Sequence, residues 1–198
     1  ALIVASSECH VEVVRLLLGA EGVEVNHGDN DGITALFMAS MEGHIDVVRL
    51  LLGVEGVEVN HGDNDGITAL FIASREGNVE IVLLLLGVEG VEVNQARDDG
   101  RTALYIASQK GQVDVVDLLL RVEGVEVNQA ASNGATALSI ASKKGHVDVV
   151  HLLLGVEGVE VNQARDNGRT ALYMASAKGH VEVVRVLLGG EGVEVNQA

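Results

Sequence analysis

The chain of 198 residues contains no proline and no tryptophan, only four aromatic residues and a single cysteine. With one thiol, Cys9, it forms no intramolecular disulfide, and a multi-cysteine zinc site is excluded. The scarcity of rings argues against a large aromatic-lined cofactor pocket, so no cofactor is expected. No apolar run approaches the roughly 18 residues that a membrane helix requires. The start of the chain is not basic and its apolar stretch is too short for a secretion signal, which favours an intracellular location.

Positive charge is also scarce, with 13 Lys and Arg against 29 Asp and Glu and a formal net charge of -16. Nucleic-acid binding is therefore disfavoured, because neutralising phosphates requires a basic face. Hydrophobic residues make up 47% of the chain and charged residues 21%, a balance typical of a folded protein rather than a disordered acidic tail.

One unit is repeated along the whole chain with a period of 34 residues. The dipeptide Asp31-Gly32, for example, returns as Asp65-Gly66 and as Asn167-Gly168. Cutting before each such turn gives a truncated repeat at 1–28 and full repeats at 29–62, 63–96, 97–130, 131–164 and 165–198. This regularity predicts one array over 1–198, a solenoid in which each repeat buries its apolar face against its neighbours.

Within a repeat the pattern predicts a helix, a turn, a second helix and a loop. Thr34 is placed to cap a first helix over 35–40, and Gly43 to end it in the left-handed conformation. A second helix is expected over 45–52, because apolar residues at 45, 48, 51 and 52 share one face. Extended chain over 53–60 is then expected to lead into the Asp-Gly turn.

The segments Asp-Gly-x-Thr-Ala-Leu, Ala-Ser-x-x-Gly-His, Val-Val-x-Leu-Leu-Leu and Gly-Val-Glu-Val-Asn resemble the ankyrin repeat, and five full copies stay in phase. The family's Thr-Pro-Leu-His is replaced by Thr-Ala-Leu followed by Phe, Tyr or Ser, its second Ala after the first helix by Ser, and each repeat is one residue longer than usual. The resemblance implies an all-α solenoid of helix-turn-helix units with short hairpin loops. It also implies a non-enzymatic scaffold that binds a protein partner through the hairpin tips and first helices.

Catalytic and metal-binding chemistry has little support in the sequence. His10, His44, His146 and His180 recur at one position of the repeat, the start of the second helix, where the family uses histidine structurally. Neighbours in such a column lie about 8–10 Å apart, too far to share a metal without convergence of their side chains. No Ser-His-Asp order, phosphate-binding glycine pattern or His-Glu-x-x-His motif is present. We therefore expect no enzyme, no catalytic residue and no metal site.

The variable positions at the hairpin turn and the end of the first helix change from acidic in the early repeats to basic in the later ones. This drift either serves recognition or reflects descent from two duplicated types of repeat. The predicted partner-binding residues are Asp31, Ile33, Met41, Glu42, Asp65, Ile67, Arg75, Glu76, Arg101, Lys110, Lys143, Lys144, Arg169 and Lys178.

Three further hypotheses remain open. The near-identical repeats are consistent with an artificial or consensus-like scaffold that has no natural partner. The residues around Asn60, Asn94, Asn128 and Asn162 resemble the motif that asparaginyl hydroxylases modify in ankyrin repeats, although Asn in this position can also simply tie the hairpin together. The first and last repeats carry apolar positions that internal repeats would bury, which predicts weak end-to-end self-association.

The four aromatic residues occupy a single column near the start of the first helix. They are expected to form a packing ladder between repeats rather than an exposed platform for stacking a ring ligand or a base. The members of this column are Phe37, Phe71, Tyr105 and Tyr173.

Overall fold

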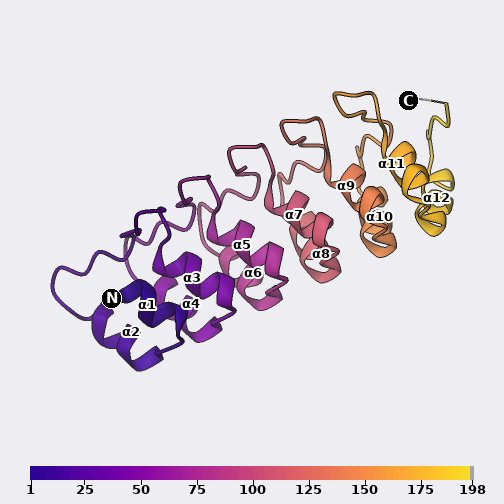
Figure 1. Ribbon diagram of the computed structural model, residues 1–198. Coiled ribbons are helices and arrows are strands. Elements are labelled where there is room, and N and C mark those ends of the chain that lie inside the picture. The colour runs from indigo at the N-terminus through magenta and orange to yellow at the C-terminus, as the bar shows by residue number, and fades with distance from the viewer. Residues whose placement is uncertain (197–198) are drawn as a thin grey trace. The chain divides into compact units, whose positions relative to one another are not determined.

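The computed structural model describes residues 1–196, and within this range the regular structure is helical (Figure 1). The described residues form no strand, and the pairing of Gly62 with Thr68 is an isolated bridge. No helix in this range has both the length and the apolar character needed to cross a membrane. The chain divides into two compact units, which we call unit 1 (residues 1–98) and unit 2 (residues 99–198).

Each unit consists of paired helices that alternate between two layers. Unit 1 contains α1 (Leu2–Ser7), α2 (Val11–Leu18), α3 (Ala35–Glu42), α4 (Ile45–Leu52), α5 (Ala69–Glu76) and α6 (Val79–Leu86). Unit 2 contains α7 (Ala103–Lys110), α8 (Val113–Leu120), α9 (Ala137–Lys144), α10 (Val147–Leu154), α11 (Ala171–Lys178) and α12 (Val181–Leu188). Within a unit, consecutive odd-numbered helices contact one another and so do consecutive even-numbered helices, which gives a layer of first helices and a layer of second helices.

From α3 onward the first helices have the predicted Thr cap and glycine stop, although α3 continues to Glu42, two residues beyond the predicted range 35–40. The hydroxyl of Thr34 accepts a hydrogen bond from the backbone N–H of Phe37 at 3.2 Å, which satisfies one of the unpaired donors of the first turn. Gly43 ends the helix with φ 81°. In the first repeat Cys9 stands in this position with φ 57°, the left-handed conformation that disfavours a side chain.

The loop after the second helix is turned rather than extended, so the expectation for residues 53–60 is wrong. The N–H of Val57 donates to the carbonyl of Val54 at 3.3 Å, and the N–H of His61 donates to the carbonyl of Glu58 at 3.1 Å. Gly56 is the third residue of the first of these turns and has φ 81°. Alternation of Val and Glu looked like a strand, but a glycine with positive φ and the absence of a pairing partner favour turns.

The core lies between the two layers and between successive repeats of a unit. In α4 the fully buried side chains are Val47, Val48 and Leu51, whereas Ile45 and Leu52 are only half-buried. The buried stripe is therefore shifted from the predicted one, because the helix is covered both by its own first helix and by the neighbouring repeats. The Ser residues that replace Ala in the first helices are buried in every repeat except the last, and their hydroxyls lack a hydrogen-bond partner among the described residues at Ser6, Ser40, Ser74, Ser108 and Ser142.

Candidate functional site

The hairpin tips of unit 1 are held by a hydrogen-bonded turn that leaves the variable side chains outside. The carboxylate of Asp63 accepts from the N–H groups of Asp65 and Ile67, both at 2.9 Å. The amide of Asn64 donates to the carbonyl of Asn30 at 3.0 Å, which joins neighbouring tips. These bonds fix the backbone while the side chain of Asp65 stays exposed and that of Ile67 half-buried.

The predicted residues of unit 1 make an acidic face. Asp31 and Glu42 are exposed, and Ile33 and Met41 are half-buried in the same repeat. Two of the acidic side chains in the next repeat are partly neutralised. Arg75 pairs with Glu76 at 2.6 Å, and Arg97 reaches Asp65 at 3.4 Å.

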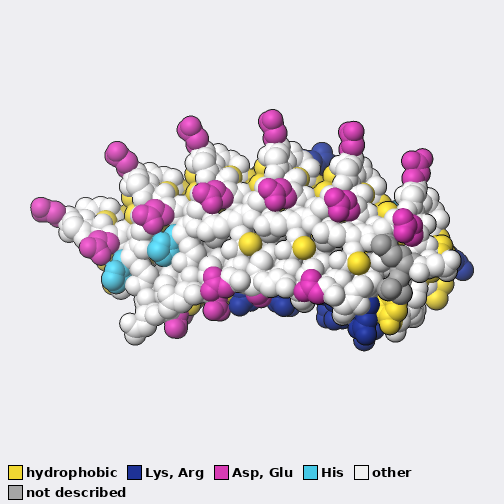
Figure 2. Space-filling view, turned by 90° about the horizontal axis from the view of Figure 1, so that it is seen from above, with side chains coloured by type: hydrophobic (Ala, Val, Ile, Leu, Met, Phe, Trp, Pro, Cys, Tyr) yellow, Lys and Arg dark blue, Asp and Glu magenta, His cyan; other side chains and the backbone are white. Residues whose placement is uncertain are grey.

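The predicted residues of unit 2 are basic and follow its row of first helices. Lys110 ends α7, Lys143 and Lys144 end α9, and Lys178 ends α11. Because these helices contact one another in sequence, their basic C-terminal ends form one edge of the unit. In the right-hand part of Figure 2, Lys and Arg side chains gather along the lower edge, whereas carboxylates project from the upper edge.

Two arginines of unit 2 are held against tyrosine rings. The guanidinium of Arg101 lies 5.6 Å from the ring centre of Tyr105, and that of Arg169 lies 5.3 Å from the ring centre of Tyr173. This distance is typical of a cation–π contact. Arg101 also pairs with Asp99 at 3.4 Å. The stacks restrain both arginines on the hairpin side of the unit.

The repeat between these two stacks carries small residues instead. Ala135 takes the place of the arginine and Ser139 the place of the tyrosine. Tyr105 fills part of this space, where it packs with Ala131, Ala135 and Ile140 and is only 2% exposed. The packing prediction for the aromatic column therefore holds for Tyr105, and also for Phe37 and Phe71 in unit 1, but Tyr173 is 37% exposed.

Arg165 belongs to the site, although sequence reasoning did not place it among the partner-binding residues. Its positive charge acts on both the Tyr105 phenol and the Lys143 ammonium group. Its Nε is buried and has no hydrogen-bond partner within residues 1–196. The signal that could have identified it is the run of small residues at Ala131 and Ala135, which leaves room above the preceding repeat.

The pKa values of Tyr105 and Lys143 are both shifted by burial and by the positive charges around them. Burial raises the pKa of Tyr105 above its ordinary value of 10.0, and the charges of Arg101 and Arg165 act in the opposite direction. Burial also lowers the pKa of Lys143, and the neighbouring cations Arg165, Lys144 and Lys178 lower it further. The depressed pKa of Lys143 therefore reflects burial first and the three neighbouring positive charges second.

The asparagines that resemble a modification motif join successive repeats. The amide of Asn60 donates to the carbonyl of Gly90 at 2.8 Å, and its oxygen accepts from the N–H of Glu92 at 2.9 Å. Asn128 and Asn162 make the same pair of bonds, and Asn94 occupies the same position in its repeat. These contacts give the asparagines a structural function that accounts for their recurrence.

The histidine column is structural, as the sequence predicts. The Nε2–H of His44 donates to the carbonyl of Ser7 at 2.8 Å, and His146 and His180 contact the carbonyls of Gln109 and Lys143 at 3.0 Å. Each ring thus supports the end of the first helix in the preceding repeat. Among the described residues, no group of three or more His, Cys, Asp or Glu side chains could hold a metal ion.

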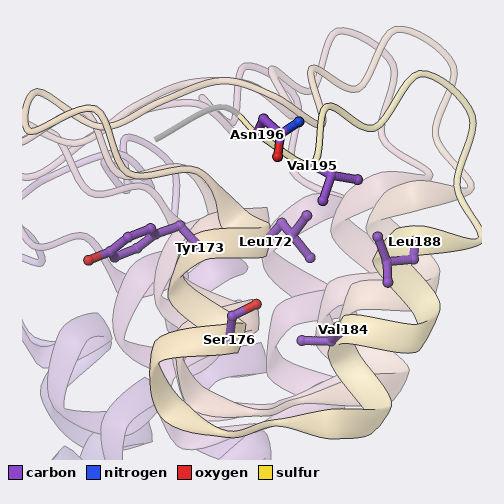
Figure 3. A pocket seen from close by; sticks show the side chains of 7 residues that line it. All are labelled: Leu172, Tyr173, Ser176, Val184, Leu188, Val195 and Asn196. Carbon is purple, nitrogen blue, oxygen red and sulfur yellow. The ribbon is translucent and has the colours of Figure 1, made fainter.

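The last repeat opens an apolar pocket of about 290 Å³ beside α11 and α12 (Figure 3). Leu172, Val184, Leu188 and Val195 gather around it, while the ring of Tyr173 extends away from them. Leu188 is 50% exposed and Val195 is 66% exposed. A second pocket, of about 280 Å³, lies in the first repeat and is lined in part by apolar side chains of α1 and α2.

The chain matches a known protein family in both sequence and structure. The family model for ankyrin repeats in three copies matches residues 1–61, 54–131 and 114–198. An ankyrin repeat domain from Acinetobacter baumannii AYE is similar in structure, with a TM-score of 0.84 and 29% sequence identity over 94% of this chain and 95% of that one. The ankyrin repeat protein EF0377 gives a TM-score of 0.88 and 26% identity over 96% of this chain and 98% of that one. A search of curated protein sequences found no significant match.

Proposed function

Because this chain belongs to the ankyrin repeat family, whose members are generally protein-interaction modules, we propose that it is a non-enzymatic scaffold for a protein partner. The partner is bound by the hairpin tips and the exposed ends of the first helices. Fold alone does not fix function, so the proposal rests on a feature of the surface. At the hairpin tips and first-helix ends the exposed side chains change from repeat to repeat. The backbone that carries them is held by the same hydrogen bonds in each repeat.

The contrast between framework and surface carries this proposal. Asn, Thr and His side chains repeat the same hydrogen bonds from one repeat to the next, whereas the tip position occupied by Ile67 in unit 1 holds Arg101, Ala135 and Arg169 in unit 2. A rigid backbone that presents changing side chains lowers the entropy cost of binding and leaves specificity to those side chains.

The proposal is tested by site-specific crosslinking in the cells from which the sequence comes. A photoreactive residue is placed at Lys110, on the exposed end of α7, and as a matched control at His151, which is exposed on the second-helix layer. We expect protein adducts from position 110 and none from position 151. Equal adducts from both positions, or none from position 110 and from the equivalent position Glu42, would overturn the proposal. The last outcome is the one expected of a scaffold without a natural partner.

A further inference from the structure

Unit 2 concentrates most of the basic residues of the chain on one face. It contains nine of the 13 Lys and Arg residues but only 12 of the 29 Asp and Glu residues. Two of these nine lie on the second-helix layer and are paired, Arg121 with Asp117 at 2.7 Å and Arg185 with Glu182 at 3.2 Å. Most of the basic residues on the other side of the unit, at the hairpins and first helices, have no such ion pair.

Six cations at the hairpins and first helices have no ion-pair partner among the described residues of unit 2, and one of them, Lys110, ends α7. Arg101, on the same side of the unit, forms an ion pair with Asp99, so the Asp99 carboxylate already has a positively charged partner. The other five unpaired cations lie on α9, on α11 and on the hairpin between them, and we call them the basic cluster: Lys143, Lys144, Arg165, Arg169 and Lys178. Like charges gathered without counter-charges destabilise one another, and an anionic ligand reverses that cost.

Lys143 is the centre of the basic cluster. It ends α9 where α9 contacts α11, and its backbone carbonyl accepts a hydrogen bond from His180 at 3.0 Å. Its side chain is half-buried, whereas that of Lys144 is exposed. Three cations, Arg165, Lys144 and Lys178, are near enough to depress its pKa in addition to the effect of burial. Charges from two helices and a hairpin therefore converge on one ammonium group.

Repeat 131–164, which precedes Arg165 in the chain, carries small residues at two positions of the hairpin and first helix. Ala135 and Ser139 leave no long side chain between the Arg101–Tyr105 stack and the Arg169–Tyr173 stack. Arg165 lies over this part of the unit with an Nε that is buried and unpaired. Ala135 and Ser139 are themselves buried, whereas Lys144, Arg169 and Lys178 are exposed and therefore accessible to a ligand.

We propose that the basic cluster of unit 2 binds an acidic peptide segment of the protein partner. Carboxylate side chains of the peptide lie among Lys143, Lys144 and Arg165, and Arg169 and Lys178 border the segment. This inference rests on the proposed scaffold function and specifies the chemistry of the partner. The charge complementarity supplies specificity and speeds association.

A nucleic acid fits this surface less well than a peptide does. The cationic area is bounded by the carboxylates of the long loops and second helices, so an extended phosphate backbone would also meet negative charge. Tyr105 is buried, and Arg169 lies over the ring of Tyr173, which is 37% exposed, so unit 2 offers at most one ring for stacking on bases and no row of them.

The test uses the full chain and a fluorescently labelled oligo-glutamate peptide, with affinity measured by anisotropy over a series of salt concentrations. We expect saturable binding that weakens as salt rises. Lys143→Gln should weaken it about three- to tenfold, the range expected for losing one partly buried charge-assisted contact. Arg185→Gln removes the same charge from the second-helix layer and should leave the affinity unchanged. Equal losses in the two variants would show an effect of overall charge and overturn the proposal.

Two competitors separate other sources of negative charge. A single-stranded oligonucleotide of matched charge should bind more weakly than the peptide. Inorganic phosphate should displace the peptide no better than chloride does at equal ionic strength. Tighter binding of the oligonucleotide that depends on Lys143 would assign the cluster to nucleic acid, and selective displacement by phosphate would assign it to a small anion. Either result contradicts the proposal.

A second measurement reports on the site itself. The peptide should raise the pKa of Lys143, followed by NMR of its side chain, because an anion offsets the charges of Arg165, Lys144 and Lys178. An unchanged pKa in the presence of saturating peptide would place the peptide elsewhere. Crosslinks from position 110 without peptide binding would refute this inference alone. Peptide binding without such crosslinks would instead remove the support for a natural protein partner.

Discussion

Asn128 holds the loop of the next repeat through both ends of its amide: Nδ2 donates to the carbonyl of Gly158 at 2.7 Å, and Oδ1 accepts from the N–H of Glu160 at 2.8 Å. One side chain therefore satisfies two backbone groups that belong to another repeat. The bond pair couples the ends of two loops that share no strand or helix. It makes this asparagine a point where the stability of neighbouring repeats is joined.

Asn128→Ala should lower the free energy of unfolding by about 1–3 kcal/mol, because two hydrogen bonds are lost and two backbone groups lose their partner. Asn128→Asp keeps the acceptor for Glu160 and loses the donor to Gly158, so its effect should be smaller. Urea unfolding followed by circular dichroism measures both variants. Unfolding midpoints for Asn128→Ala that match those of the parent chain would show that the pair contributes nothing.

Cys9→Gly should stabilise the chain by about 0.5–1 kcal/mol. Cys9 has φ 57°, where glycine has no steric penalty, and the gain is reduced because glycine also gives the unfolded chain more freedom. Cys9→Ser is the control, since it removes the thiol but retains the strained side chain. A thermal unfolding series should show a higher midpoint for Gly alone. Equal midpoints for Gly and Ser would rule out backbone strain as the cause.

Ser108→Ala should also stabilise the chain, by about 0.5–1.5 kcal/mol. The hydroxyl of Ser108 is buried without a hydrogen-bond partner, and alanine removes that unsatisfied group while favouring the helix. Ser176 occupies the same helix position in the last repeat but is exposed, so Ser176→Ala shares only the gain in helix propensity. Chemical denaturation should show a larger gain at position 108. The reverse order would contradict the burial argument.

Tyr105 makes stability sensitive to alkaline pH. The pKa of Tyr105 is raised in the folded chain, which means that folding favours its neutral phenol. The resulting contribution to the free energy of unfolding is complete below pH 10.0, the ordinary pKa, and is lost as the pH rises through the pKa of the folded chain. In the Tyr173→Phe variant Tyr105 is the only tyrosine, and its absorbance titration should have a midpoint above 10.0. Tyr105→Phe should reduce the loss of stability at alkaline pH. A midpoint at or below 10.0 would show that the arginine charges outweigh burial.

The chain should associate weakly end to end. Leu188 and Val195 are exposed beside an apolar pocket in the last repeat, and Leu16 is 75% exposed in the first. Such apolar surface favours contact between molecules, although the net charge of -16 opposes it. Sedimentation velocity should show a concentration-dependent increase in sedimentation coefficient that Leu188→Glu abolishes. A monomer at every concentration, including at high salt, would refute the expectation.

Local chemistry made much of the fold predictable from the sequence. The hydroxyl of Thr34 and the positive φ of Gly43 set the two ends of α3 through residues that are adjacent in the sequence, so the motif alone identified both. The loop after α4 was misjudged because the alternation of Val and Glu imitates a strand. The turn there depends on Gly56 and on the lack of any chain to pair with.

The candidate site was only partly predictable, for a related reason. The column holding Arg101 and Arg169 is visible by aligning the repeats, and the change of charge along the chain follows directly. The position of the Arg165 side chain depends instead on the preceding repeat, where residues 131 and 135 are the small residues Ala131 and Ala135. The charge of Arg165 belongs to the same change from acidic to basic along the repeats, but its proximity to Tyr105 and Lys143 depends on packing between repeats, which the sequence does not show.

The bonds that join repeats span a constant length of chain. The asparagine amide reaches a carbonyl 30 residues ahead each time, and the histidine ring reaches one 37 residues back. Recombination between misaligned copies of the coding sequence that adds or deletes one period of 34 residues therefore leaves every such partner in place. A change of one whole repeat would thus need no compensating mutation in the hydrogen bonds of the framework.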